Sequence, residues 1–75
     1  VEHALEEREL AEAIDRFLRT LPERECSMFL RRYWYVDSVQ SIAARYAIKE
    51  NTAKSILFRT REKLRRYLAG EGIIV

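Results

Sequence analysis

Proline and glycine, the residues that most often interrupt regular structure, are nearly absent from this chain. Its 75 residues contain one proline and two glycines. A fold made of many short strands needs many turns, and turns depend on these residue types. Their scarcity favours a few long helices. A chain of this length is expected to form one domain.

Apolar residues recur at offsets of three and four near the N-terminus, which predicts an amphipathic helix over residues 2–20. Pro22 marks a break and a restart, because a proline at the first helical position gives up only a hydrogen bond that is unmade there anyway. A second helix is predicted over residues 22–35. The expected inward residues are Leu10, Ala11, Ile14, Phe17, Leu18 and Leu21, followed by Cys26, Phe29, Leu30 and Tyr33.

Ser38 is placed to cap a third helix over residues 38–46, by accepting a hydrogen bond from the backbone amide of residue 40 or 41. A fourth helix is predicted over residues 50–69, with Gly70 as its stop. About four residues join these two helices, with Ile48 positioned to fill the angle between them. The expected inward residues are Val39, Ile42, Ala43 and Tyr46, followed by Ala53, Leu57, Thr60, Leu64 and Leu68.

These patterns together predict an all-α domain of four helices with a helix-turn-helix over residues 38–69. It would be a winged-helix-like DNA-binding fold without a wing. Charge agrees with this, since residues 1–37 carry six Lys or Arg against nine Asp or Glu, whereas residues 38–75 carry eight against three. A polyanion is therefore expected to meet the C-terminal half.

The outer face of the fourth helix begins with small hydrogen-bonding side chains. Asn51, Thr52, Ser55 and Arg59 lie opposite the apolar side at 100° per residue. Small polar groups permit close approach to base edges, while Lys and Arg contact phosphate. A solvated basic helix is the alternative interpretation of this face.

Several separate motifs resemble region 4 of the sigma-70 family, and most closely its extracytoplasmic-function type. The likeness is collinear from about Phe17 to Leu68. It rests on LPER at residues 21–24, FLRRY at 29–33, Ser38 with Ile42 and Ala43, and ENTAKSILFRTREKL at 50–64.

The resemblance implies a domain that recognises the minus-35 promoter element and grips the flap of the RNA polymerase β subunit. The expected DNA-binding residues are Asn51, Thr52, Lys54, Ser55 and Arg59, with Arg45 as a backbone contact. No catalysis, cofactor or metal is expected, and the domain is expected to be a cytoplasmic monomer. The resemblance also allows an anti-sigma factor as a partner. No association with a membrane is expected.

The chain departs from the family pattern at several positions. Ile56 replaces a usual arginine, which predicts weaker phosphate contact, and Ala47 replaces the usual glycine of the turn. If that position needs a positive φ, alanine there costs about 1 kcal/mol. Val36-Asp37 stands where Gly-Leu is commoner, and Ser41 replaces the acid that would complete a capping box with Ser38.

The aromatic run that ends the second helix leaves two interpretations open. Trp34 or Tyr35 either fills the edge of the core or contributes to a polymerase-binding surface. Phe58 is expected to pack at the core edge rather than against a thymine methyl. Cys26 is expected to be a small buried hydrophobe, and His3 has no second ligand at metal-binding spacing.

Three other functions compete with the sigma interpretation. An output domain of the LuxR kind has a similar helix-turn-helix, but the proline-marked second helix and residues 54–64 favour the sigma interpretation. A sigma-like module that binds polymerase or another sigma factor without reading DNA stays open. An enzyme is the weakest alternative, because the chain offers neither a nucleophile–base pair nor a phosphate-binding glycine loop.

Overall fold

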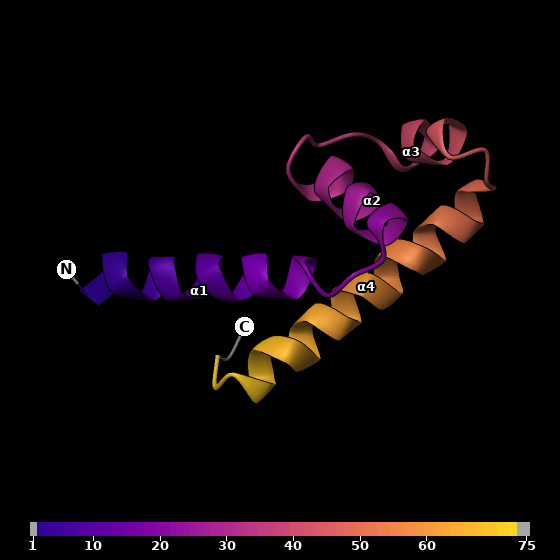
Figure 1. Ribbon diagram of the computed structural model, residues 1–75. Helices are drawn as coiled ribbons and strands as arrows, with labels where there is room; N and C mark the ends of the chain where they lie inside the picture. The colour runs from indigo at the N-terminus through magenta and orange to yellow at the C-terminus, as the bar shows by residue number, and fades with distance from the viewer. Residues whose placement is uncertain (1, 74–75) are drawn as a thin grey trace.

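The computed structural model describes residues 2–73, with side chains described from residue 7 onward. Helices are the only regular structure in this part of the chain, as predicted (Figure 1). They are α1 (Glu2–Leu18), α2 (Glu23–Tyr33), α3 (Val39–Arg45) and α4 (Glu50–Gly70). The first two helices each end two residues earlier than the apolar pattern predicts.

The long helix α4 is the centre of the fold, because it packs against each of the other three helices. Its N-terminal half, together with α2 and α3, encloses the main hydrophobic core. Ile48 packs against this core from the turn between α3 and α4, as expected. The buried core residues are Met28, Ile42, Ala43, Ala53, Ile56 and Leu57. The helix-turn-helix is therefore built around its own core.

Helix α1 packs against the C-terminal half of α4 and extends away from the rest of the molecule (Figure 1). Phe17 is buried, with its ring centroid 5.6 Å from that of Tyr67. Arg16 forms an ion pair with Glu71 at 3.0 Å. The predicted apolar stripe of α1 is only partly covered, since Ile14 is half-buried and Ala11 is exposed.

The inward face of α2 differs from the prediction. Met28 is fully buried beside Phe29, whereas Cys26 is half-buried and Tyr33 is 46 % exposed. The reason is that α2 is covered by α3 as well as by α4, and Met28 belongs to the core that these helices share. The Tyr33 ring instead lies against Phe29, with a centroid distance of 4.8 Å.

Two residues other than glycine adopt left-handed backbone, Val36 with φ 58° and Ala47 with φ 55°. Ala47 ends α3 in a Schellman motif. Its N–H donates to the Ala44 carbonyl at 3.2 Å, and the Ile48 N–H donates to the Ala43 carbonyl at 3.0 Å. The turn therefore places alanine where the family resemblance expects glycine, and the positive φ considered for this position is present.

A second Schellman motif ends α4. The Gly72 N–H donates to the Ala69 carbonyl at 3.0 Å, and the Ile73 N–H donates to the Leu68 carbonyl at 2.8 Å. Gly72 has φ 80° and is the left-handed residue. The prediction that Gly70 stops the helix is wrong, because Gly70 is still helical and the left-handed backbone comes two residues later.

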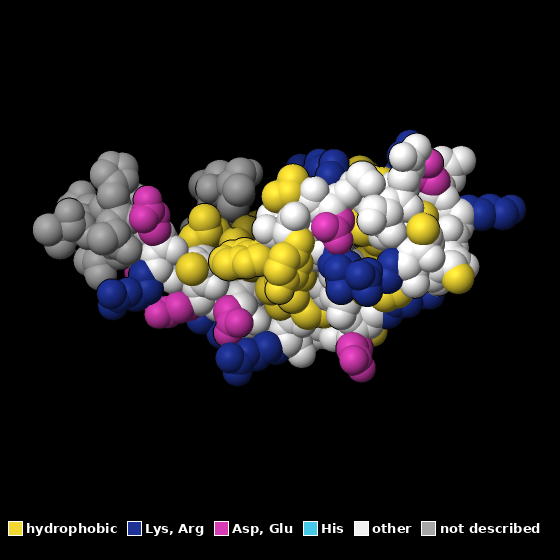
Figure 2. Space-filling view, turned by 90° about the horizontal axis from the view of Figure 1, so that it is seen from above, with side chains coloured by type: hydrophobic (Ala, Val, Ile, Leu, Met, Phe, Trp, Pro, Cys, Tyr) yellow, Lys and Arg dark blue, Asp and Glu magenta, His cyan; other side chains and the backbone are white. Residues whose placement is uncertain are grey.

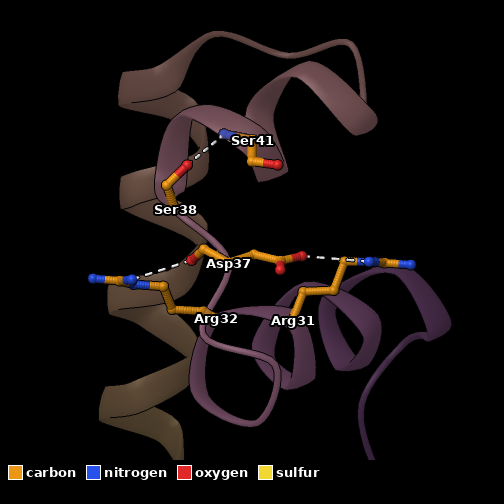
Figure 3. Close-up of polar contacts among 5 residues, drawn as sticks. All are labelled: Arg31, Arg32, Asp37, Ser38 and Ser41. Carbon is orange, nitrogen blue, oxygen red and sulfur yellow. Dashed lines mark hydrogen bonds and ion pairs between the residues drawn. The ribbon is translucent and has the colours of Figure 1, made fainter.

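Five polar residues fix the link from α2 to α3 (Figure 3). Arg31 Nη1 donates to the Asp37 carboxylate at 3.3 Å, and Arg32 Nη1 donates to the Asp37 backbone carbonyl at 3.1 Å. The Ser41 N–H donates to Ser38 Oγ at 3.0 Å, which confirms Ser38 as the N-cap of α3. We call these residues the Asp37 clasp. It holds the start of α3 against the end of α2.

Candidate nucleic-acid interface

The outer face of α4 presents the residues that the sequence predicts for DNA binding. All five are exposed, and the buried residues Ala53 and Leu57 occupy the opposite side of the same helix. The five are Asn51, Thr52, Lys54, Ser55 and Arg59. The structure thus places them together on one accessible face. Arg45, in the last turn of α3, is also exposed.

The first turn of α4 projects from the core-packed turn that contains Ile48. Lys49 is the N-cap and its side chain makes no capping hydrogen bond. Uncapped N–H groups and the partial positive charge of a helix start suit a phosphate. Glu50 offsets part of that charge and pairs with Lys54 at 3.6 Å.

Most basic residues of α4 lie in its C-terminal half. Arg65 pairs with Glu62 at 2.8 Å. Within residues 7–73, Arg59, Lys63 and Arg66 take part in no ion pair. These three exposed cations give the outer face of α4 its positive charge, which attracts polyanions in a salt-dependent manner.

A separate apolar groove of about 760 Å³ lies between α1, the end of α2 and α4. Figure 2 shows hydrophobic side chains gathered where α1 meets the rest of the molecule. Trp34 and Tyr35 line this groove and are 76 % and 67 % exposed. Of the two interpretations of the aromatic run, core-edge packing is therefore wrong for both residues. The apolar lining includes Ile14, Leu18, Phe29, Leu30 and Leu64.

Arg61 lies at the edge of the groove, away from the outer face of α4. Its Nη1 donates a hydrogen bond to the Tyr33 hydroxyl at 3.4 Å. This hydrogen bond raises the pKa of Arg61 above its ordinary value. Like any arginine, Arg61 is charged at neutral pH, so it contributes a positive charge to the edge of the groove.

Comparison with known families identifies the fold and the helix-turn-helix. The family model described as sigma-70, region 4 matches residues 17–66, two thirds of the chain. The chain belongs to the sigma-70 region 4 family. A comparison with curated proteins and one with solved structures gave no significant match. Sigma-70 region 4 is a helix-turn-helix domain that binds DNA in transcription initiation, and it is not an enzyme family.

The structure corrects the prediction for Ile56 in this region 4 domain. Ile56 is only 4 % exposed and belongs to the core with Met28 and Leu57. Its backbone carbonyl also accepts a hydrogen bond from the buried Thr60 hydroxyl at 2.9 Å. An isoleucine here fills space inside the domain, so it removes no charge from the outer face of α4.

Phe58 also departs from the prediction, because it is more exposed than expected. It is 60 % exposed, so it does not pack at the core edge. It lies on the outer side of α4 beside Arg59, Glu62 and Arg65. The sequence places Phe58 between the apolar and polar sides of α4, and the structure leaves this part of the helix surface uncovered.

The described side chains contain no group of three His, Cys, Asp or Glu residues that could hold a metal ion. His3 lies outside the residues whose side chains are described. The half-buried Cys26 is a free thiol. Over residues 2–73, no helix is long and apolar enough to cross a membrane.

Proposed function

We propose that this domain recognises the minus-35 promoter element as the C-terminal domain of a sigma factor docked on RNA polymerase. The observation that carries the proposal is the exposed, polar and cationic outer face of α4, held by a core that includes α3. A cytoplasmic, extracytoplasmic-function-like factor that acts as a monomer, with control by an anti-sigma factor, belongs to the same proposal.

In this mechanism α4 enters the major groove and α3 supports it from behind. Asn51 and Arg59 are separated by about 12 Å along the helix axis, comparable to the width of the groove. Asn51, Ser55 and Arg59 would read base edges. Thr52, Lys54 and Arg45 would contact phosphates and fix the register.

The groove beside Trp34 and Tyr35 is the proposed docking site for polymerase. An apolar groove between helices takes the nonpolar face of an amphipathic helix. The family match supports RNA polymerase as a partner, and the flap of the β subunit is the occupant that we propose. Exposed aromatic side chains are the residue type that most often contributes strongly to protein interfaces.

The groove also supports a second candidate function, a module that binds polymerase or another sigma factor without reading DNA. Its size and apolar lining are independent of the outer face of α4. Ile56 gives this alternative no support, because its side chain lies in the core and removes no charge from the outer face of α4. The two functions differ in whether residues 51–59 respond to DNA.

An NMR titration of the labelled chain tests the proposal. A short duplex with a minus-35-like sequence and a scrambled duplex are each added at two salt concentrations. We expect salt-sensitive shifts centred on residues 51–59, with a stronger response to one duplex. An absence of shifts at low salt would favour the polymerase-binding module, and titration with a flap-tip peptide would then test that alternative.

Substitution of Arg59 distinguishes base reading from phosphate binding. If Arg59 pairs with a guanine edge, Arg59→Ala should cost about 1–3 kcal/mol and relax preference at one base pair. A uniform loss across sequences with a shallower salt dependence would assign Arg59 to phosphate instead. Lys63→Ala is the matched control, because Lys63 is an exposed cation one turn further along α4.

A further inference from the structure

Helix α1 has an apolar side that the described part of the chain covers only in part. The helix is 17 residues long and projects away from the other helices (Figure 1). Leu10 and Ile14 are half-buried on this side, and Ala11 is exposed. An amphipathic helix normally buries its apolar side against another element.

The same chain contains a groove of the kind that receives such a helix. The apolar groove between α1, the end of α2 and α4 has Ala11, Ile14 and Leu18 as its α1 wall. A helix in a groove of this kind is held by its nonpolar face. A second copy of the chain can supply its own α1 to this groove and receive the first copy's α1 in return. Such a reciprocal contact is the geometry of a two-fold dimer.

Glu7 and Arg61 give the two halves of this contact opposite charges. At 100° per residue, Glu7 falls between Ile14 and Leu18, within the apolar side of α1. Arg61 is the one cation among the described residues that line the groove. Both side chains are exposed, and within residues 7–73 neither takes part in an ion pair. Each one therefore lacks the opposite charge that the other supplies.

One antiparallel register of two α1 helices satisfies the apolar and the charged contacts together. A two-fold axis midway between Ala11 and Ile14 sets Ala11 of one copy against Ile14 of the other. The same point is midway between Glu7 and Leu18, so Glu7 of one copy lies level with Leu18 of the other. Because Leu18 and Arg61 line the groove together, this register brings Glu7 to the edge where Arg61 lies.

We propose that two copies of this domain form a weak two-fold dimer, in which α1 of each copy occupies the groove of the other and Glu7 pairs with Arg61. Tyr33, Trp34 and Tyr35 at the groove are 46 %, 76 % and 67 % exposed. Covering them would bury on the order of 300 Å² in each copy. With the apolar sides of both α1 helices the total approaches about 1,000 Å², which is typical of weak complexes.

This inference goes beyond the proposed function. The dimer covers the groove that we propose for polymerase, so the monomer is the form that docks there. The residues of α4 between Asn51 and Arg59 do not line the groove. The dimer therefore leaves the proposed DNA-binding face open.

Sedimentation equilibrium of the 75-residue chain, from micromolar to millimolar concentration, tests the dimer. We expect the average mass to rise from the monomer value of 8.9 kDa toward twice that value, with a Kd of about 10–100 µM. Glu7→Arg and Arg61→Glu should each raise Kd at least about tenfold, because each replaces attraction by repulsion at two symmetric positions. The double variant should return to within about threefold of the wild type.

Glu9→Arg is the matched control. It makes the same change of charge at an exposed position on the opposite side of α1 from the apolar residues. It should leave Kd within about twofold of the wild-type value. All the substituted side chains are exposed, so the variants should fold, which circular dichroism checks.

Three results would overturn the inference. A chain that stays monomeric at millimolar concentration would leave the groove to a helix of another protein. A double variant that fails to restore the dimer would place the contact elsewhere, and an equal loss in Glu9→Arg would show an effect of net charge alone. None of these results changes the outcome of the DNA titration, so failure of the dimer and failure of the proposed function are distinguishable.

Discussion

Val36 and Ala47 hold left-handed backbone without being glycine, and they flank the seven-residue helix α3 on both sides. The left-handed conformation brings the Cβ atom close to the following carbonyl, which costs roughly 1–2 kcal/mol for an L residue. The cost is greater for a β-branched side chain such as valine. The first helix of the helix-turn-helix is therefore flanked by two strained positions.

Ala47→Gly should stabilise the domain by about 1 kcal/mol, because glycine adopts the observed φ without steric cost. In a domain of this size the melting temperature should rise by about 4–8 °C. Thermal unfolding followed by circular dichroism measures the change. Ala44→Gly, at an exposed helical position of α3, is the control and should lower the melting temperature.

Val36→Gly should also raise the melting temperature, by at least as much as Ala47→Gly. Val36 is 76 % exposed, so little packing is lost with its side chain. Val36→Ala keeps the Cβ atom and should recover only part of the gain. If Val36→Gly and Val36→Ala raise the melting temperature equally, the strain comes from the branched valine side chain rather than from the left-handed backbone.

Individual residues were predicted unevenly from the sequence. The capping role of Ser38 and the packing of Ile48 follow from local chemistry, and both are confirmed. The burial of Ile56 and the exposure of Phe58 were not predicted, because the helices that pack against α4 decide how much of its circumference is buried. Met28 of α2 belongs to the core on the side of Ile56, whereas the outer side of Phe58 remains open to solvent.

At the scale of elements, the link between α2 and α3 depends on the Asp37 clasp. The side chains of Arg31 and Asp37 are about 30 % exposed, which reduces solvent screening relative to a surface ion pair. This link sets where α3 begins, and through the shared core it sets the position of α4.

Asp37→Ala should destabilise the domain by about 1 kcal/mol, because it removes a partly buried charge-assisted hydrogen bond. Asp15→Ala is the matched control. It breaks the Asp15–Arg19 pair at 3.0 Å, whose side chains are 60 % and 79 % exposed, and should cost at most a few tenths of a kcal/mol. Urea unfolding of both variants measures the difference, and equal losses would show that the Arg31–Asp37 pair adds nothing beyond a surface pair.

The existence and order of the four helices follow from apolar periodicity, and the family match supports the helix-turn-helix. The apolar groove does not follow from the sequence. The stripe of α1 predicted a helix with one buried side, but how far that side is covered depends on where α2 ends and how α1 meets α4. The exposure of Trp34 and Tyr35 is likewise a tertiary property.

At the scale of the whole molecule, the two proposed binding surfaces should be separable by substitution. Trp34→Ala should weaken binding of a flap-tip peptide at least tenfold, as expected for an aromatic interface residue. It should leave DNA affinity unchanged, because Trp34 lies in the groove. Arg59→Ala should show the reverse pattern.

Peptide and duplex titrations of both variants measure this separation, with circular dichroism as a check on folding. A Trp34→Ala variant that loses both activities while it remains folded would contradict the assignment of two independent surfaces. If that variant unfolds, Trp34 contributes to the core instead. The exposure of Trp34 argues against this outcome.

Helix α4 contributes to both surfaces, with the exposed residues between Asn51 and Arg59 on its outer face and with Arg61 and Leu64 in the groove. Because an α-helix turns 100° and rises 1.5 Å per residue, inserting a single residue between Arg59 and Arg61 would rotate one surface relative to the other by more than a quarter turn. Relatives of this domain can therefore vary the side chains on both surfaces, but we expect insertions and deletions to be excluded from this stretch and confined to the loops.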